Sequence, residues 1–202
     1  MSRFRARNVL RCGIGLVAAV TLVTACGQPA QAHDKHVKRV IATIESPSPG
    51  PARIVPATLE IPKIGVNATV EQVTVTSQNA MGVPKKPMDV GWYSPGVAPG
   101  QNGDAVIDGH LDWYGVPKAV FYNLGQLTDG DEIDVVAQNG TKLRFQVTSE
   151  SSVSSSSQPQ GLFSTTGSPR LTLITCAGTW DSKSSQYTQR LLVNASYIGS
   201  AT

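Results

Sequence analysis

Three residues of complementary chemistry stand at the ends of apolar runs. Cys176 closes the run of residues 171–176, His110 closes a second run, and Arg190 directly precedes a third. A thiolate can attack a carbonyl carbon, an imidazole can move protons near neutral pH, and a guanidinium can bind an oxyanion. Together these groups could cleave a peptide bond through a thioester and stabilise the charge that develops during the reaction.

The run that ends in Cys176 has the sequence Leu-Thr-Leu-Ile-Thr-Cys. Its short length and its β-branched residues predict a strand rather than a helix. A strand fixed in a sheet holds the backbone while its terminal side chain faces a cleft lined by loops. We expect His110 and Arg190 to stand at strand ends in the same way, so that one sheet positions all three groups.

Strands are also predicted earlier in the chain. Apolar and polar residues alternate in part over residues 59–62 and more clearly over residues 68–75, as expected for half-buried strands. Pro62 should end the first of these strands or place it at a sheet edge, because proline has no backbone N–H to donate. A short helical piece is predicted around residues 119–124.

A hairpin is predicted over residues 132–148. Its two arms flank Asn139 and Gly140, a pair that accommodates the positive φ angles of a tight turn. The serine-rich segment that follows, residues 151–160, has few side chains to bury and predicts a mobile loop. This loop leads into the strand that carries Cys176.

The composition favours an all-β fold. Nineteen glycines and 13 prolines indicate many turns, and the pattern contains about seven or eight short strands with little helix. We therefore predict a closed or nearly closed β-barrel of about eight strands with one or two short helices over residues 58–202.

Residues 1–26 have the features of an export signal. Four arginines precede an apolar stretch at residues 13–23 that is too short for a usual membrane span. Residues 23–27 resemble a bacterial lipobox, in which Cys26 would receive a lipid and become the mature N-terminus. The alternatives are an uncleaved anchor and a plain secretory signal. Residues 27–57 are proline-rich and predict a flexible linker that holds the domain off the membrane.

The charge and cysteine content narrow the function further. The formal charge is only +3 and the body of the chain has no basic stripe interleaved with aromatic residues, so no nucleic-acid partner is expected. Of the three cysteines, Cys12 lies in the signal and Cys26 would carry lipid. Cys176 then has no partner for a disulfide, and it is either a buried inert thiol or a nucleophile. No cofactor and no metal site are predicted.

The order His110, Cys176, Arg190 resembles the sortase signature, in which a TLxTC strand lies between an upstream histidine and a downstream arginine. The resemblance extends from about Leu59 to Ala195 and includes the segment Gly109-His110-Leu111-Asp112. Residues 176–181 together with Tyr187 are similar to class F sortases of actinobacteria, with class E the nearest neighbour. The chain departs from most sortases at its N-terminus, where a lipid would replace a transmembrane helix.

The resemblance implies a cysteine transpeptidase. Cys176 would attack an LPxTG-like sorting signal after the threonine, His110 would protonate the leaving amine, and Arg190 would bind substrate carbonyls and the oxyanion. Thr175 would line the substrate site beside the nucleophile. Asp112 would orient His110 or contact the substrate, although a simple turn aspartate fits the sequence equally well.

The same resemblance implies the partners and the location. The substrates would be secreted proteins with C-terminal sorting signals, and the acceptor would be an amine of a cell-wall precursor or of a pilin. The enzyme is expected to be a monomer, anchored by lipid at the extracytoplasmic face of the cell membrane. Two alternatives remain open at this stage. One is a hydrolytic cysteine peptidase of the same fold, and the other is a non-catalytic lipoprotein that binds sorting signals.

Overall fold

The structure is a computed structural model that describes residues 53–201. The predicted signal at residues 1–26, its lipidation site Cys26 and most of the predicted linker lie outside the described residues. Within the described part of the chain, no helix is both long enough and apolar enough to cross a membrane.

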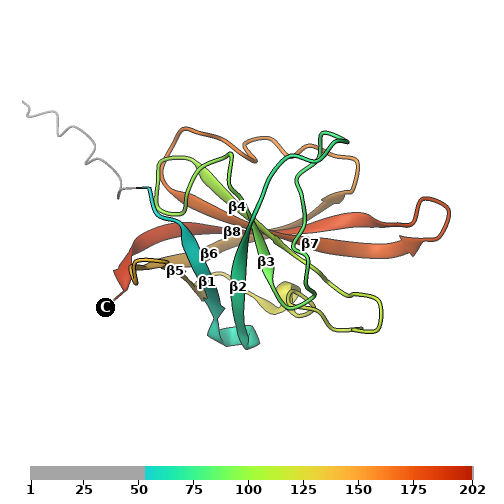
Figure 1. The fold of residues 1–202 in the computed structure, drawn as a ribbon, viewed down its shortest axis with the longest axis horizontal. Helices are drawn as coiled ribbons and strands as arrows, with labels where there is room; N and C mark the ends of the chain where they lie inside the picture. The colour runs from blue at the N-terminus through green and yellow to red at the C-terminus, as the bar shows by residue number, and fades with distance from the viewer. Residues whose placement is uncertain (1–52, 202) are drawn as a thin grey trace, which may run out of the picture. The chain divides into compact units, whose positions relative to one another are not determined.

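The described residues form a closed all-β barrel of eight strands with two short 3-10 helices (Figure 1). This architecture confirms the predicted fold class. The elements in chain order are β1 (Pro56–Ile61), η1 (Pro62–Ile64), β2 (Val66–Val73), β3 (Val90–Tyr93), β4 (Asp104–Gly109), η2 (Leu124–Gln126), β5 (Glu132–Ala137), β6 (Lys142–Ser154), β7 (Arg170–Asp181) and β8 (Gln186–Ala201).

The order of strands around the barrel is β1-β2-β3-β4-β7-β8-β6-β5, and β5 closes on β1. The pairs β2/β3 and β4/β7 are parallel, whereas the other pairs are antiparallel. Strand β7 therefore lies between β4 and β8. His110 directly follows the end of β4, as predicted. Cys176 and Arg190 do not stand at strand ends, because β7 continues to Asp181 and β8 begins at Gln186.

Alternating side chains of the strands fill the barrel. In β2, for example, Val66, Ala68 and Val70 are buried while Asn67 and Thr69 are exposed. The aromatic rings of Trp92, Phe121 and Phe145 are among the largest fully buried groups. The Trp92 indole N–H donates a 3.1 Å hydrogen bond to the Val97 carbonyl, so the polar atom of this ring is satisfied.

The predicted hairpin is present as β5 and β6, but its turn differs from the prediction in detail. Gly140 has a φ of +83°, whereas Asn139 is not among the residues with positive φ. The Gly140 N–H donates to the Ala137 carbonyl at 2.9 Å, and the Ala137 N–H donates to the Thr141 carbonyl at 2.8 Å. These bonds close a longer turn, in which a single residue in the left-handed region is sufficient.

Two local predictions are wrong. The segment around residues 119–124 forms turns, and the 3-10 helix η2 begins only at Leu124. The serine-rich segment is not a loop throughout, because β6 continues to Ser154. Residues of β6 up to Ser154 pair with β8 as far as Gln189. Backbone hydrogen bonds to this long partner strand extend β6 even though its serine side chains are exposed.

Gly109, which precedes His110, is closely packed against buried side chains. A Cβ at this position would lie 2.6 Å from an atom of the Phe121 ring and 2.8 Å from Val120 Cγ1. We expect Gly109→Ala to lower the free energy of unfolding by about 1–3 kcal/mol, because the buried ring must shift. Urea unfolding checks this. The control Gly125→Ala, where the nearest atom is the Leu191 methyl at 3.4 Å, should be close to neutral, and equal stabilities would contradict the prediction.

Candidate active site

Parallel pairing of β4 with β7 brings His110, which directly follows β4, next to the part of β7 that contains Cys176. The register places Asp108 beside Ile174. At the next position, the Thr175 hydroxyl donates a 2.8 Å hydrogen bond to the Gly109 carbonyl. His110 and Cys176 are the residues that follow directly on each strand. The register thus places the backbone of His110 next to that of Cys176, and the cooperation of their side chains stays a prediction.

Arg190 lies directly opposite Cys176 in the antiparallel pair of β7 and β8. Its Nη1 donates hydrogen bonds to the backbone carbonyls of Tyr187, at 3.2 Å, and Gln189, at 2.9 Å. The guanidinium therefore binds peptide carbonyl oxygens of its own strand. Cys176, His110 and Arg190, which were predicted from separate motifs, are brought together by two strand pairings.

Cys176 is a free, partly buried cysteine. Burial raises the pKa of its thiol above the usual value, and the negative charge of Asp112 acts in the same direction. The positive charge of Arg190 opposes them and lowers the pKa. Because the net direction is upward, the sulfur is a thiol at neutral pH before substrate binds. Attack on a carbonyl then requires that its proton be removed.

The His110 ring is held by two contacts. Its Nε2 lies 3.0 Å from the Pro84 carbonyl oxygen, and because a carbonyl can only accept, Nε2 carries the proton in this contact. The ring also packs edge-to-face against Trp113, with the ring centroids 4.5 Å apart. These contacts orient the imidazole after the end of β4, and no carboxylate of residues 53–201 hydrogen-bonds it.

Asp112 and Thr175 form hydrogen bonds with residues other than the predicted ones. A carboxylate oxygen of Asp112 accepts a hydrogen bond from the Tyr187 hydroxyl, a contact that, with burial, raises the pKa of Tyr187 to about 12. Thr175 is buried, and its hydroxyl is turned to the Gly109 carbonyl. The prediction that either residue contacts a substrate stays a prediction. Asp112 instead ties the loop after His110 to β8.

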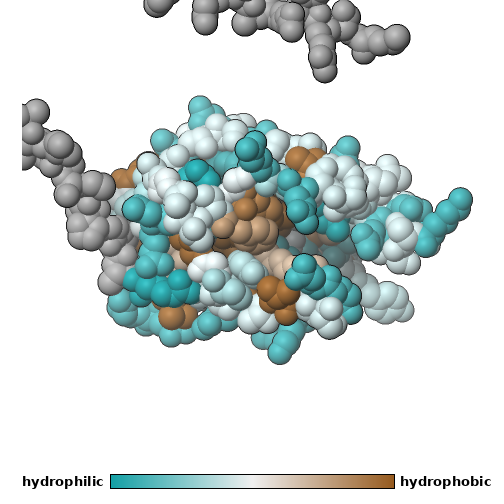
Figure 2. All heavy atoms as spheres, turned by 90° about the horizontal axis from the view of Figure 1, so that it is seen from above, coloured by the Kyte–Doolittle hydropathy of each residue, from teal (hydrophilic) through white to brown (hydrophobic). Residues whose placement is uncertain are grey.

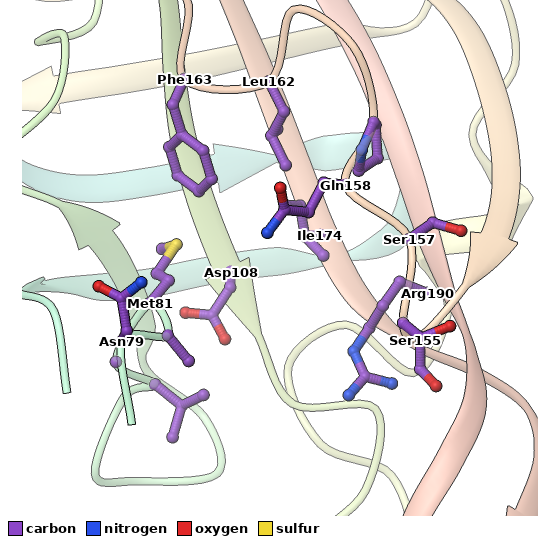
Figure 3. A pocket seen from close by; sticks show the side chains of 15 residues that line it. Asn79, Met81, Asp108, Ser155, Ser157, Gln158, Leu162, Phe163, Ile174 and Arg190 are labelled. Atoms are coloured by element: carbon purple, nitrogen blue, oxygen red, sulfur yellow. The ribbon is translucent and has the colours of Figure 1, made fainter. Parts of the chain in front are cut away.

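A groove with a volume of about 710 Å³ lies next to these residues (Figure 3). Asp108, Ile174 and Arg190 contribute to it from β4, β7 and β8, and the segments 79–83 and 155–163 form its walls. In the space-filling view of Figure 2, apolar side chains gather in a central hollow with hydrophilic residues around it. Arg190, which pairs with Cys176 across β7 and β8, lines the groove, whereas Cys176 itself is not among the lining residues.

Asp108 is a site residue that the sequence reasoning did not identify. It lines the groove, and its Oδ1 is buried without a hydrogen-bond partner among the described residues. Burial raises the pKa of this carboxyl to about 8, although the charge of Arg190 lowers it. The available signal was an acidic residue in a strand that is otherwise apolar over residues 105–107. Across residues 53–201, no group of three or more His, Cys, Asp or Glu residues could hold a metal ion.

The opposing effects of nearby charges on the pKa of Cys176 can be tested by mutation. Arg190→Gln should raise the pKa of the Cys176 thiol, because it removes the positive charge that stabilises the thiolate. Asp112→Asn should lower that pKa for the opposite reason. Thiolate absorbance measured against pH reports both values. Lys63→Ala, which removes a positive charge outside the site, is the matched control, and an unchanged pKa in Arg190→Gln would contradict the assignment.

Comparisons with known proteins agree with the fold. Sortase A from Corynebacterium diphtheriae is 23% identical, with a TM-score of 0.57, over 73% of this chain and 62% of that chain. Sortase C1 from Streptococcus agalactiae, in its complex with MTSET, is 23% identical, with a TM-score of 0.55, over 70% of this chain and 66% of that chain. The Clostridium perfringens sortase D5 transpeptidase is 23% identical, with a TM-score of 0.54, over 72% of this chain and 79% of that chain.

At these identities, the structural likeness shows the fold alone, and the chain spans less than two thirds of the first of these relatives. No curated protein matches the chain. The family model described as Sortase domain matches residues 59–198, which is more than half of the chain. The chain therefore belongs to the Sortase domain family.

Proposed function

We propose that this protein is a transpeptidase that cleaves an LPxTG-like sorting signal through a thioester on Cys176. It then transfers the new carboxyl end to an amine. The observation that carries the proposal is the arrangement in the middle of β7, where Cys176 pairs with Arg190 of β8, and His110 directly follows the neighbouring parallel strand β4. Nucleophile, proton carrier and oxyanion donor are the three functions that acyl transfer requires.

In the first half of the reaction, His110 takes the thiol proton and the Cys176 sulfur attacks the scissile carbonyl carbon. The tetrahedral intermediate collapses as the C–N bond breaks, and His110 gives the proton to the leaving amine. In the second half, the acceptor amine attacks the thioester and loses a proton to His110. The C–S bond breaks, and the proton returns to the sulfur, so that the enzyme is regenerated.

Arg190 would bind the oxyanion and the carbonyl oxygens of the substrate. In the ligand-free structure its Nη1 already donates to two backbone carbonyls, which are the same type of acceptor. Its planar group presents several donors in a fixed geometry and stays charged at all relevant pH values. Exchange of the Tyr187 and Gln189 carbonyls for those of a bound peptide requires only a side-chain movement.

The groove supports a peptide as the substrate. Apolar side chains of Met81, Leu162 and Phe163 line it, which suits the apolar residues at the start of an LPxTG-like motif. Segment 155–163 forms one wall and would help to set the specificity. The substrates would be secreted proteins with C-terminal sorting signals, and the acceptor would be an amine of a cell-wall precursor or a pilin.

The remaining details of the proposal rest on the sequence. Residues 176–181 and Tyr187 favour class F, or its neighbour class E, and Cys26 would carry the lipid that holds a monomeric enzyme at the extracytoplasmic face of the membrane. Hydrolysis is a second outcome of the same chemistry, because Cys176 is only partly buried and water could resolve the thioester. A non-catalytic binder of sorting signals is the third candidate.

Intact mass spectrometry of the full chain in detergent, incubated with LPxTG and LAxTG peptides, tests the proposal. We expect a mass increase that corresponds to an acyl adduct and that disappears when a glycine amine is added. Cys176→Ala is the control and should show no adduct. An adduct that is lost at the same rate without the amine would favour the hydrolase, and peptide binding without any adduct would favour the binder.

The role of Arg190 predicts a large kinetic loss. Arg190→Ala should lower kcat/KM by about a hundredfold or more, because one oxyanion donor contributes on the order of 3 kcal/mol. Arg190→Lys keeps the charge but not the planar set of donors, so it should recover little of this loss. Initial rates of peptide cleavage provide the measurement. Near-parent activity of Arg190→Lys would show that charge alone is sufficient.

A further inference from the structure

Asp108 lies in the groove in an unusual environment. Its Oδ1 is enclosed and accepts no hydrogen bond from the described residues. A Cβ at Gly91 of the paired strand β3 would lie only 2.8 Å from this oxygen, so the carboxyl occupies space that a larger residue would fill. Buried polar atoms without a partner are rare and costly. No described structural contact of Asp108 accounts for that cost.

The groups around Asp108 determine its charge. Strand β3 faces it with Gly91, and the groove walls at residues 79–83 and 155–163 contain no ionisable side chain. Arg190 from β8 acts on it, and Cys176 from β7 is the other titratable group with which it interacts. Burial outweighs the attraction of Arg190, and the pKa of Asp108 is about 8. At neutral pH the carboxyl therefore carries a proton and can donate a hydrogen bond.

The position of Asp108 relates it to the reacting groups. It precedes His110 by two residues on β4, and side chains two residues apart on a strand share a face. Ile174, its neighbour on β7, precedes Cys176 by two residues in the same way. A group of the peptide bound over Asp108 would thus lie one step along the groove from the nucleophile. In Figure 3, the Asp108 carboxyl extends into the groove between Met81 and Ile174.

We propose that Asp108 is a further substrate-binding residue, which donates a hydrogen bond from its carboxyl group to a carbonyl oxygen of the bound peptide. This inference rests on the proposed function, because it assigns a role within the same groove. The bond would fix the register of an extended peptide relative to Cys176. An extended peptide offers a carbonyl oxygen at each residue, and the Oδ1 of Asp108 has no hydrogen-bond partner among the described residues.

An ionised Asp108 would act differently. A carboxylate cannot donate to a carbonyl oxygen and would repel it, so peptide binding should weaken as the carboxyl loses its proton. A carboxylate could instead pair with Arg190 and hold that side chain away from the substrate. The charge-neutral substitution Asp108→Asn separates these two roles, because an amide can donate a hydrogen bond but cannot serve as a counter-ion.

The experiment measures KM and kcat for a sorting peptide with the full chain and its variants. Asp108→Ala should raise KM about three- to tenfold at pH 7, the usual range for a lost neutral hydrogen bond. Asp108→Asn should recover most of this loss. In the parent protein, KM should also rise as the pH passes about 8, whereas this rise should be absent in Asp108→Asn. Asp129→Ala removes an exposed acidic residue and should match the parent.

Two results would overturn the inference. An unchanged KM in Asp108→Ala would mean that the carboxyl does not contact the peptide, and an equal loss in Asp108→Asn would mean that its negative charge is what matters. If Asp108→Ala does not fold, as judged by thermal unfolding, Asp108→Asn still decides through its pH profile. In that case, a rise in the KM of Asp108→Asn at alkaline pH as large as that of the parent would contradict the proposal that the Asp108 carboxyl donates the hydrogen bond.

A binding measurement keeps this inference separate from the proposed function. The Kd of the same peptide is measured for Cys176→Ala and for the double variant Cys176→Ala/Asp108→Ala, neither of which can form a thioester. A three- to tenfold weaker Kd in the double variant supports Asp108 even if the parent shows no transpeptidation. A thioester in the parent with equal Kd values supports the enzyme and overturns the role of Asp108. Absence of binding by both variants overturns it as well.

Discussion

The parallel pairing of β4 with β7 is the constraint on which the site depends. His110 and Cys176 are far apart in the sequence, and this pairing places His110, which directly follows β4, next to the part of β7 that contains Cys176. The buried bond from Thr175 to the Gly109 carbonyl fixes the last step of the register. A slip by one residue would turn every side chain of β7 to the opposite face. The register would then direct Cys176 into the core and away from the groove.

The second constraint is the balance of charge around the sulfur. Arg190 is paired with Cys176 across β7 and β8 and lowers the pKa of the thiol, Asp112 opposes this effect, and burial dominates. The resting thiol is therefore protected from ionisation in the absence of substrate. A bound peptide that draws Arg190 toward the scissile bond would bring its positive charge to the sulfur, so that activation of the nucleophile and binding of the substrate depend on the same side chain.

The sequence predicted the barrel, the β5/β6 hairpin and the residue set His110, Cys176 and Arg190 because each depends on local pattern or on motif order. It could not predict the bond between Asp112 and Tyr187, which joins residues 75 positions apart. It also missed the extension of β6 through the serine-rich segment, because pairing with β8 rather than burial of side chains determines it. Asp108 escaped notice since its importance depends on the groove walls, which only the fold brings together.

The strands and the walls of the groove differ in composition. Among the described residues that line it, Asp108 and Arg190 are the only ionisable ones, and both lie on the strands, whereas the walls are apolar or neutral. Neutral walls contribute apolar contacts and weak hydrogen bonds, which tolerate variation in a peptide's side chains. The strands then supply the contacts to the peptide backbone that fix its position. A barrel wall that also carries His110 and Cys176 can hold those contacts in register with the chemistry, because all of them belong to one hydrogen-bonded sheet.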